Sequence, residues 1–392
     1  MSIKELDNAY VAPTYARFPV EIVSGKGSLL FGADGKEYID MGTGIAVNAF
    51  GVADEEWIAA VTAQLSRVQH TSNLYYTEPC AKLAAALCTA TGAKKVFFGN
   101  SGAEANECAI KVARKYAADK KGADYYNVVT LQNSFHGRTL TTLAATGQEH
   151  YHELFQPLTP GFLHTPANDV EALRSLVARE KVAGILIECV QGEGGVNSLD
   201  AEFVRAVEQI CRENDIVFMV DEVQTGNGRS GEMYAYMHYG VTPDVVSTAK
   251  GLGGGLPIGA CILWERVENV LGHGDHGSTF GGNPVACAGA LSILSRMDGE
   301  LLAGVTMRSE YIRTRLLACD GVNGVSGMGL MLGVDTKRPA AEVVRECMAR
   351  GVLCLTAKTR VRLLPALNIP MDVLEKALDV LCEVLAEKGE TQ

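Results

Sequence analysis

Long apolar runs are missing from this 392-residue chain, which nowhere approaches the ~18 consecutive apolar residues of a membrane helix. Residues 1–10 include Lys, Glu and Asp, whereas a signal peptide needs an apolar core there. Acidic side chains outnumber basic ones, with 46 Asp and Glu and 35 Lys and Arg, and the formal net charge is -11. We therefore expect a cytoplasmic protein that binds neither membranes nor nucleic acid.

Closely spaced cysteine motifs are also missing. The eleven cysteines include no Cys-x-x-Cys pair, and most lie in apolar surroundings. His273 and His276 flank Asp275, but no second cluster at ligand spacing completes a metal site. We expect reduced packing cysteines, no disulfide framework and no bound metal.

Glycine is abundant, with 42 residues, and many of them cluster just after short apolar runs. Five such runs have the composition of buried strands: 95–98, 127–131, 184–188, 216–221 and 244–248. Helical patterns lie between them, as in the spacing of Ala105, Ala109, Val112 and Tyr116. The alternation predicts an α/β fold whose mainly parallel sheet is covered on both faces and binds ligands at its carboxyl edge.

The ends of the chain have a different character. From residue 296 an amphipathic stretch, a glycine-rich strand pair and two more helical stretches predict a small α+β domain over 296–392. Residues 46–295 would form the large domain. A hairpin around Gly35 is expected within 1–45, a segment that we expect to pack with the small domain.

Two strand ends carry candidate catalytic groups. Lys250 ends one apolar run and precedes a glycine cluster. Desolvation can keep such an amine neutral, as a nucleophile requires, although an ordinary strand-end lysine would look the same. Asp221 ends another run, where its carboxylate could hold a proton on a heterocyclic nitrogen or could simply cap a loop.

Three further features suit a flat, phosphorylated ligand. The segment 99–106 joins a strand to a helix, so its free N–H groups and the Ser101 hydroxyl could cradle a phosphate, or Ser101 could only cap the helix. Phe135 could stack on a ring, while Arg138 could grip a carboxylate or form a structural ion pair. Glu193 and Arg362 could equally be unrelated charges.

Taken together, these segments resemble the class III (subgroup II) aminotransferases of the fold-type I pyridoxal-phosphate superfamily. The resemblance runs from about residue 13 to beyond residue 365. Its segments are Pro13-Thr-Tyr-Ala-Arg, His70-Thr-Ser-Asn-Leu-Tyr, Asn100-Ser-Gly-Ala-Glu-Ala-Asn, Ser134-Phe-His-Gly-Arg-Thr, Glu188-x-x-Gln-Gly-Glu-Gly-Gly, Asp221-Glu-Val-Gln-Thr-Gly-x-Gly-Arg, Ala249-Lys-Gly and Ser278-Thr-Phe-Gly-Gly-Asn-Pro. The pattern departs from the family over residues 49–57.

The resemblance implies a seven-stranded sheet in the large domain, the cofactor pyridoxal 5'-phosphate and a homodimer with shared active sites. It implies that Lys250 carries the covalent link to the cofactor and that Asp221 pairs with the pyridine nitrogen. The other implied cofactor contacts are Ser101, Gly102, Ala103, Phe135, His136, Glu188, Val223 and Gln224, with Ser278 and Thr279 coming from the other subunit.

The implied substrate contacts are Tyr15, Arg138, Glu193 and Arg362. Gly44 and the 70–75 segment resemble acetylornithine-type members. That likeness implies transfer of the terminal amino group of N-acetylornithine to 2-oxoglutarate, a step of arginine biosynthesis. Ornithine, succinylornithine and 4-aminobutyrate are alternative amino donors. Alternative functions of other classes are an aminomutase and a regulatory cofactor-binding protein.

Overall fold

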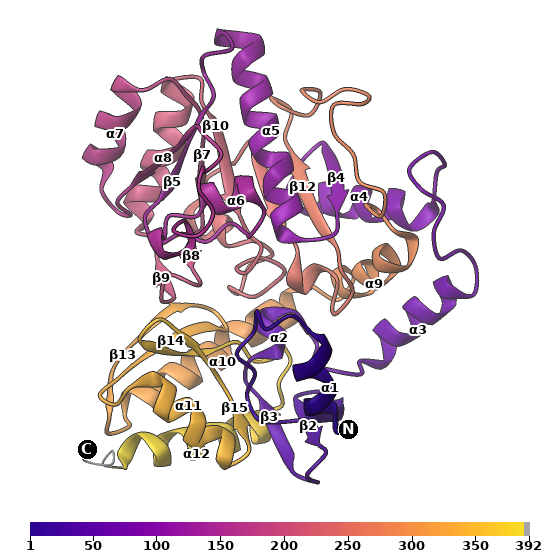
Figure 1. Ribbon diagram of the computed structural model, residues 1–392, viewed down its shortest axis with the longest axis vertical. Coiled ribbons are helices and arrows are strands. Elements are labelled where there is room, and N and C mark those ends of the chain that lie inside the picture. Colours follow the sequence, from indigo (N-terminus) through magenta and orange to yellow (C-terminus); the bar gives the residue numbers. More distant parts are fainter. Residues whose placement is uncertain (388–392) are drawn as a thin grey trace.

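The computed structural model describes residues 1–387 and has a seven-stranded sheet at its centre (Figure 1). The strand order is β4-β12-β11-β10-β7-β5-β6. Only β12 runs antiparallel to its neighbours, so the predicted mainly parallel sheet is confirmed. In chain order the strands are β4 (Lys95–Gly99), β5 (Asn127–Leu131), β6 (Phe162–Thr165), β7 (Val182–Ile187), β10 (Val217–Asp221), β11 (Val245–Thr248) and β12 (Gly259–Leu263).

Both faces of this sheet are buried because alternate strand residues point to opposite sides. Val128 and Leu186 pack with the apolar face of α5, whereas their neighbours Val129 and Ile185 belong to the cluster formed with α4, α7 and α8. The helices of this part of the chain are α3 (Glu55–Leu65), α4 (Glu78–Thr91), α5 (Gly102–Lys121), α6 (Leu140–Ala145), α7 (Val170–Arg179), α8 (Ala201–Glu213) and α9 (Pro284–Leu294). Its shorter elements are η1 (Glu149–Tyr151), β8 (Val190–Gln191), β9 (Asn197–Ser198), η2 (Ala235–Tyr239) and η3 (Lys250–Leu252).

A second, four-stranded sheet of order β13-β14-β17-β16 lies in the C-terminal part. Its strands are β13 (Val322–Met328), β14 (Met331–Thr336), β16 (Leu355–Ala357) and β17 (Arg360–Leu363). The helices beside it are α10 (Gly299–Leu317), α11 (Ala340–Ala349) and α12 (Met371–Ala386). Their buried faces share one core cluster with Leu332 and Val334.

The expectation that all cysteines are unpaired was wrong for one pair. Cys319, just after α10, forms a disulfide with Cys382 in α12, with their Cα atoms 5.6 Å apart. Their separation of 63 positions in the sequence gave no local spacing signal, because only the packing of α10 beside α12 brings the two side chains together.

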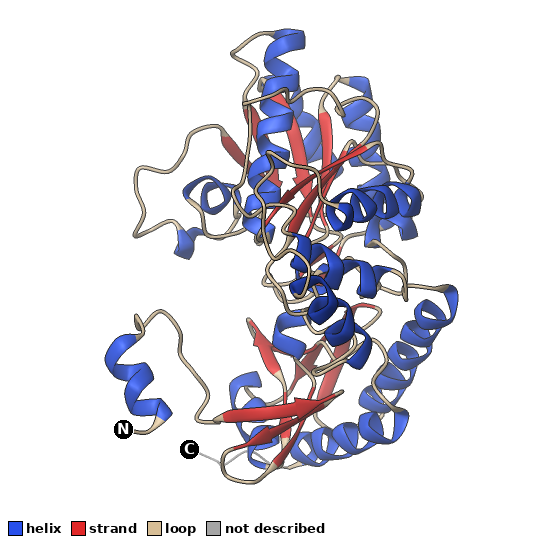
Figure 2. Ribbon diagram, turned by 90° about the vertical axis from the view of Figure 1, so that its right-hand side faces the viewer, coloured by secondary structure: helices blue, strands red, loops and turns tan. Residues whose placement is uncertain are grey.

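The N-terminal strands join the C-terminal part of the chain. The expected hairpin consists of β2 (Leu29–Gly32) and β3 (Glu37–Asp40), extended by β1 (Ile22–Lys26). β3 pairs in parallel with β15 (Val352–Leu353), which links the two ends of the chain in one sheet. α2 (Thr43–Ala46) follows β3, while α1 (Ile3–Tyr10) stands away from the remaining chain on a long loop (Figure 2).

The domain limits 1–45, 46–295 and 296–392 stay a prediction, and residues 388–392 of the last range lie outside the described residues. No helix within residues 1–387 combines the length and the apolar character needed to cross a lipid bilayer.

Candidate active site

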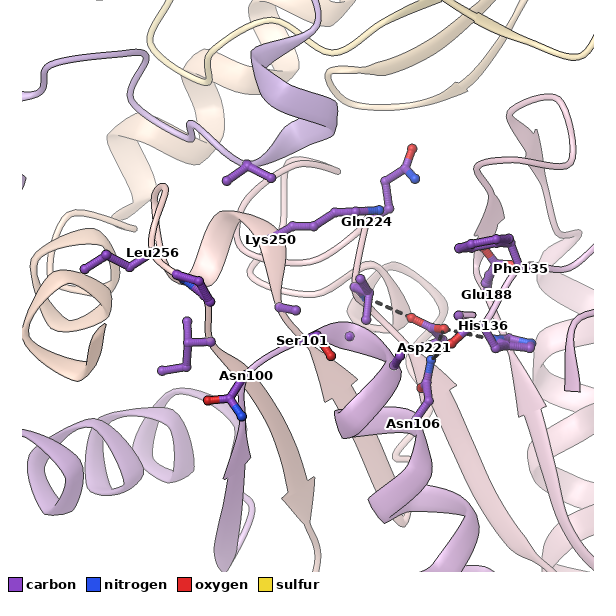
Figure 3. A pocket seen from close by; sticks show the side chains of 18 of the residues that line it. Asn100, Ser101, Asn106, Phe135, His136, Glu188, Asp221, Gln224, Lys250 and Leu256 are labelled. Carbon is purple, nitrogen blue, oxygen red and sulfur yellow. Dashed lines mark hydrogen bonds and ion pairs between the residues drawn. The ribbon is translucent and has the colours of Figure 1, made fainter. Parts of the chain in front are cut away.

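A cavity of about 370 Å³ lies at the carboxyl edge of the large sheet (Figure 3). Five strands end at it, because Ser101 follows β4, Phe135 follows β5, Glu188 follows β7, Asp221 ends β10 and Lys250 follows β11. The cavity brings together ten predicted residues: Ser101, Gly102, Ala103, Phe135, His136, Glu188, Asp221, Val223, Gln224 and Lys250.

Asp221 is held in one orientation at the floor of this cavity. Its Oδ1 accepts from the backbone N–H of Val223 at 3.0 Å. Its Oδ2 lies 2.8 Å from Nδ1 of His136 and accepts from Nδ2 of Asn106 at 2.7 Å. Because the side chain is only 4% exposed, these donors replace the water that a carboxylate otherwise needs.

Lys250 opens η3 with a left-handed backbone (φ 45°), a conformation that costs a non-glycine residue about 1–3 kcal/mol. Asn227 fixes the preceding residue by donating from Nδ2 to the carbonyl of Ala249 at 3.1 Å. Burial lowers the pKa of the Lys250 amine, against the opposing attraction of Glu193 and Asp221. The fold therefore favours the neutral, nucleophilic form of this amine relative to an exposed lysine.

The start of α5 forms another wall. Ser101 is its N-cap and accepts from the backbone N–H of Glu104 at 3.2 Å. Gly102 allows close packing there, because a Cβ at this position would lie 2.6 Å from Cγ1 of Val223. The free N–H groups and positive end of a 20-residue helix thus face the cavity beside Lys250.

Glu188 ties the loop after β7 to Phe135 across the cavity. Its Oε2 accepts from the backbone N–H of Phe135 at 2.9 Å. Burial and the nearby Asp221 carboxylate raise the pKa of Glu188 well above its usual range. Glu188 therefore positions the aromatic ring, and burial disfavours its charged form.

Glu193 and Arg362 form an ion pair next to the cavity. Nη1 of Arg362, on β17, donates to Oε1 of Glu193 at 2.5 Å and to Oε1 of Gln224 at 3.3 Å. Burial alone would raise the pKa of Glu193, but the positive charge of Arg362 outweighs it and the pKa is lowered. Gln224 lines the cavity, so it links this pair to the site of Lys250.

Other predicted site residues lie farther out. Arg138 is exposed, and its guanidinium carbon lies 4.8 Å from the ring centroid of Tyr151 and 5.7 Å from that of Phe135. Tyr15 is 74% exposed and lines a separate cavity of about 480 Å³ together with Gly44.

Ser278 and Thr279 precede the 280–283 loop of the same chain. Ser278 Oγ accepts from Nδ2 of Asn100 at 3.0 Å, and Thr279 is exposed. Both line a hollow of about 420 Å³ next to Asn100 and Glu104.

Sequence reasoning missed Asn106, Ser247 and Trp57 as parts of the site. Asn106 ends a motif that matched the family, and a polar residue among the buried alanines of α5 was the available signal. Trp57, in the segment that departs from the family pattern, donates from Nε1 to the carbonyl of Gly253 at 3.0 Å. The segment that departs from the family pattern therefore supports the glycine-rich loop after Lys250 through Trp57.

Comparisons with known proteins found relatives that match nearly the whole chain. Acetylornithine aminotransferase of Haemophilus ducreyi is 49% identical over 387 residues, covering 98% of this chain and 98% of that protein. The fold is similar to ornithine aminotransferase of Toxoplasma gondii, with a TM-score of 0.93, 31% identity and coverage of 97% of this chain and 94% of that one. It is also similar to N-acetylornithine aminotransferase of Stenotrophomonas maltophilia, with a TM-score of 0.85, 32% identity and coverage of 97% and 98%. The Aminotransferase class-III family model matches residues 10–385, and the chain therefore belongs to the class-III aminotransferases, enzymes of fold-type I that depend on pyridoxal phosphate.

Proposed function

We propose that this enzyme transfers the terminal amino group of N-acetyl-L-ornithine to 2-oxoglutarate, giving N-acetyl-L-glutamate 5-semialdehyde and L-glutamate. The observation that carries the proposal is one cavity holding the Lys250 amine and the Asp221 carboxylate, with the Glu193–Arg362 pair beside it. The 49% identity to a relative named acetylornithine aminotransferase supports the choice of donor.

The residues of the cavity fit pyridoxal 5'-phosphate. Ser101, Gly102 and Ala103 line the cavity at the start of α5, where the hydroxyl and the free N–H groups of the helix would hold the phosphate. Phe135 and Val223 would cover the two faces of the ring, Gln224 and His136 would lie at its edges, and Glu188 would support Phe135. When bound, the cofactor supplies a carbonyl that links to amines and a ring that withdraws electrons from the adjacent carbon.

The two charged groups of the cavity divide the proton chemistry. The Asp221 carboxylate, held by three donors, would keep a proton on the heterocyclic nitrogen by attraction in a site with little water. Burial lowers the pKa of the Lys250 amine. Its Nζ would accept the proton from the amino-bearing carbon of the substrate and then donate it to a neighbouring carbon.

Two substrates with different charge patterns must use the same site. While the donor's terminal amine reacts, Glu193 would keep Arg362 occupied and Arg138 would bind the distant carboxylate. Opening of the Glu193 pair would release Arg362 for the α-carboxylate of glutamate. Gly44 offers no side chain that could hold free ornithine, and this supports an acylated donor.

We further propose a cytoplasmic homodimer in which Ser278 and Thr279 complete the phosphate site of the other subunit. Large apolar side chains cluster around the 70–76 segment and are unusually exposed in the single chain: Leu74 85%, Tyr75 71%, Tyr76 106% and Phe280 59%. Such a patch is typical of a surface that another chain covers.

The test is a half-reaction without any keto acid. N-acetylornithine, ornithine and 4-aminobutyrate are added separately to the purified enzyme, and loss of the visible band of the bound cofactor is timed. We expect N-acetylornithine to react fastest, and Lys250→Ala to abolish the response. Faster reaction with ornithine or 4-aminobutyrate would overturn the donor assignment. Product formation without 2-oxoglutarate, with the amino group returned to the same skeleton, would indicate an aminomutase.

A further inference from the structure

Asn106, in α5, lines the cavity next to Asp221 (Figure 3). It is 1% exposed and is surrounded along the helix by buried apolar residues. A buried amide costs free energy unless it is fully hydrogen-bonded, whereas a leucine, with the same branched shape, would suit an apolar helix face. The partners of this amide therefore indicate why a polar residue is present.

Every hydrogen-bonding group of the Asn106 side chain has a partner. Nδ2 donates one proton to Oδ2 of Asp221 at 2.7 Å and the other to the carbonyl of His136 at 2.8 Å. Oδ1 accepts from the hydroxyl of Ser247 at 2.5 Å. Because both groups facing Nδ2 are acceptors, the partners themselves fix which end of the amide is the nitrogen.

The amide joins four elements at one carboxylate. Asn106 comes from α5, His136 from the loop after β5, Asp221 from β10 and Ser247 from β11. A carboxylate only accepts hydrogen bonds, so the contact of 2.8 Å between Asp221 Oδ2 and His136 Nδ1 places the imidazole proton on Nδ1. Asn106 and His136 thus approach the same oxygen from two elements, and together they hold the carboxylate plane.

We propose that Asn106 is a positioning residue for Asp221, oriented in turn by Ser247, and that it holds the carboxylate ready for the protonated ring nitrogen of pyridoxal phosphate. The inference rests on the proposed role of the cavity. Asn106 acts through Asp221: without it, Asp221 Oδ2 loses a donor, the loop of His136 loses its tether, and the carboxylate can turn away from the ring.

The test compares Asn106→Leu and Ser247→Ala with the wild-type enzyme, using Thr130→Val as the matched control. Thr130 is a fully buried hydroxyl on β5 that donates to the carbonyl of Ala145 at 2.7 Å, away from Asp221. For each protein we would measure the dissociation constant of pyridoxal phosphate from the apoenzyme, the pH midpoint of the visible band of the holoenzyme, and the thermal midpoint of the apoenzyme.

We expect Asn106→Leu to weaken cofactor binding by about tenfold to a hundredfold, the range for losing a hydrogen bond to a charged group. The pH midpoint of the visible band should rise, because a loosely held carboxylate is less able to keep the ring nitrogen protonated and the ring therefore carries less positive charge. Ser247→Ala should change both quantities in the same direction by less. Thr130→Val should lower only the thermal midpoint.

Unchanged cofactor affinity and band midpoint in both site variants, with a reduced thermal midpoint alone, would make Asn106 a structural residue and overturn the inference. Ser247→Ala decides the question if Asn106→Leu does not fold. A wild-type enzyme that forms no visible band with pyridoxal phosphate would instead contradict the proposed role of the cavity.

Discussion

Oε1 of Glu193, in the turn between β8 and β9, accepts a hydrogen bond from Nη1 of Arg362 on β17. The arginine side chain is 4% exposed and the glutamate side chain is 26% exposed, so the pair is closed to water mainly on the arginine side. A buried guanidinium needs a counter-charge, and this glutamate or an incoming carboxylate can provide it. The pair is therefore suited to exchange one carboxylate for another.

Replacing Glu193 by Gln should favour the substrate whose α-carboxylate competes for Arg362. We expect the ratio of kcat/KM for glutamate to that for N-acetylornithine to rise by about tenfold, equivalent to about 1.4 kcal/mol of differential binding. Single-turnover rates with each amino acid would measure it, with Glu193→Asp as the control that keeps the charge. An unchanged ratio in the Gln variant would contradict the exchange of carboxylates at Arg362.

The same pair predicts the pH dependence of this preference. The pKa of Glu193 is lowered in the folded enzyme by Arg362, so the stabilisation from the pair is present above the ordinary carboxyl pKa. It is lost only as the pH falls through the lowered pKa. The glutamate preference of the wild-type enzyme should therefore stay constant near neutral pH and approach that of Glu193→Gln only in acid.

Arg138 is held in the corner between Tyr151 and Phe135, whose rings meet edge to face with centroids 5.8 Å apart. Tyr151→Leu removes one cation–π contact, which is worth about 0.5–1 kcal/mol at exposed sites. We expect KM for carboxylate-bearing donors to rise about two- to fivefold with little change in kcat. Tyr151→Phe should behave like the wild type, and a diamine donor without a carboxylate should be insensitive to both variants. Equal losses with the diamine would mean that Tyr151 does not act through Arg138.

Local patterns were sufficient to predict five of the seven strands of the large sheet and the residues at its carboxyl edge. Each of these five strands ends at a polar residue or is followed directly by one, as β10 ends at Asp221 and Glu188 follows β7. The local patterns missed β6 and β12, and the sequence of β12 follows a glycine cluster that is typical of loops. They also missed the Asp221–Asn106–Ser247 contacts, which depend on how α5 lies across the sheet. Tyr15 and Gly44 line a second cavity because the N-terminal segment, which was expected to pack with the small domain, lies against the C-terminal part of the chain.

The Cys319–Cys382 bond should respond to the redox state. It closes a loop between residues 63 apart, and disulfides typically contribute about 2–4 kcal/mol to the free energy of unfolding. We expect dithiothreitol or Cys319→Ser to lower the thermal midpoint of the oxidised protein, with no added effect of the reductant on the variant. Thiol labelling before and after reduction would count the cysteines involved. The proposed cytoplasmic location predicts that the pair labels as free thiols in protein trapped directly from cells, because the cytoplasm keeps thiols reduced.

Glu222 is a fully buried carboxyl beside Asp221, and its burial should make the stability of the protein depend on pH. Burial raises the pKa of Glu222 from 4.5 to about 7, against hydrogen bonds from Thr225 and from the backbone N–H of Tyr236. The folded state therefore retains a proton that the unfolded chain loses, so the favourable contribution is complete below the ordinary pKa and is lost as the pH rises through about 7. The shift corresponds to at most about 3 kcal/mol.

Glu222→Gln can keep these hydrogen bonds without a titrating group, since its amide can accept from the Tyr236 N–H and donate to the Thr225 hydroxyl. Urea unfolding of both proteins between pH 4.5 and 7.5 would compare the slopes. We expect the stability of the wild-type protein to fall relative to the variant as the pH rises across this range, so that the variant gains most at the upper end. Parallel curves would mean that Glu222 has the same proton affinity in the folded and unfolded chains. They would contradict the raised pKa of this buried carboxyl next to Asp221.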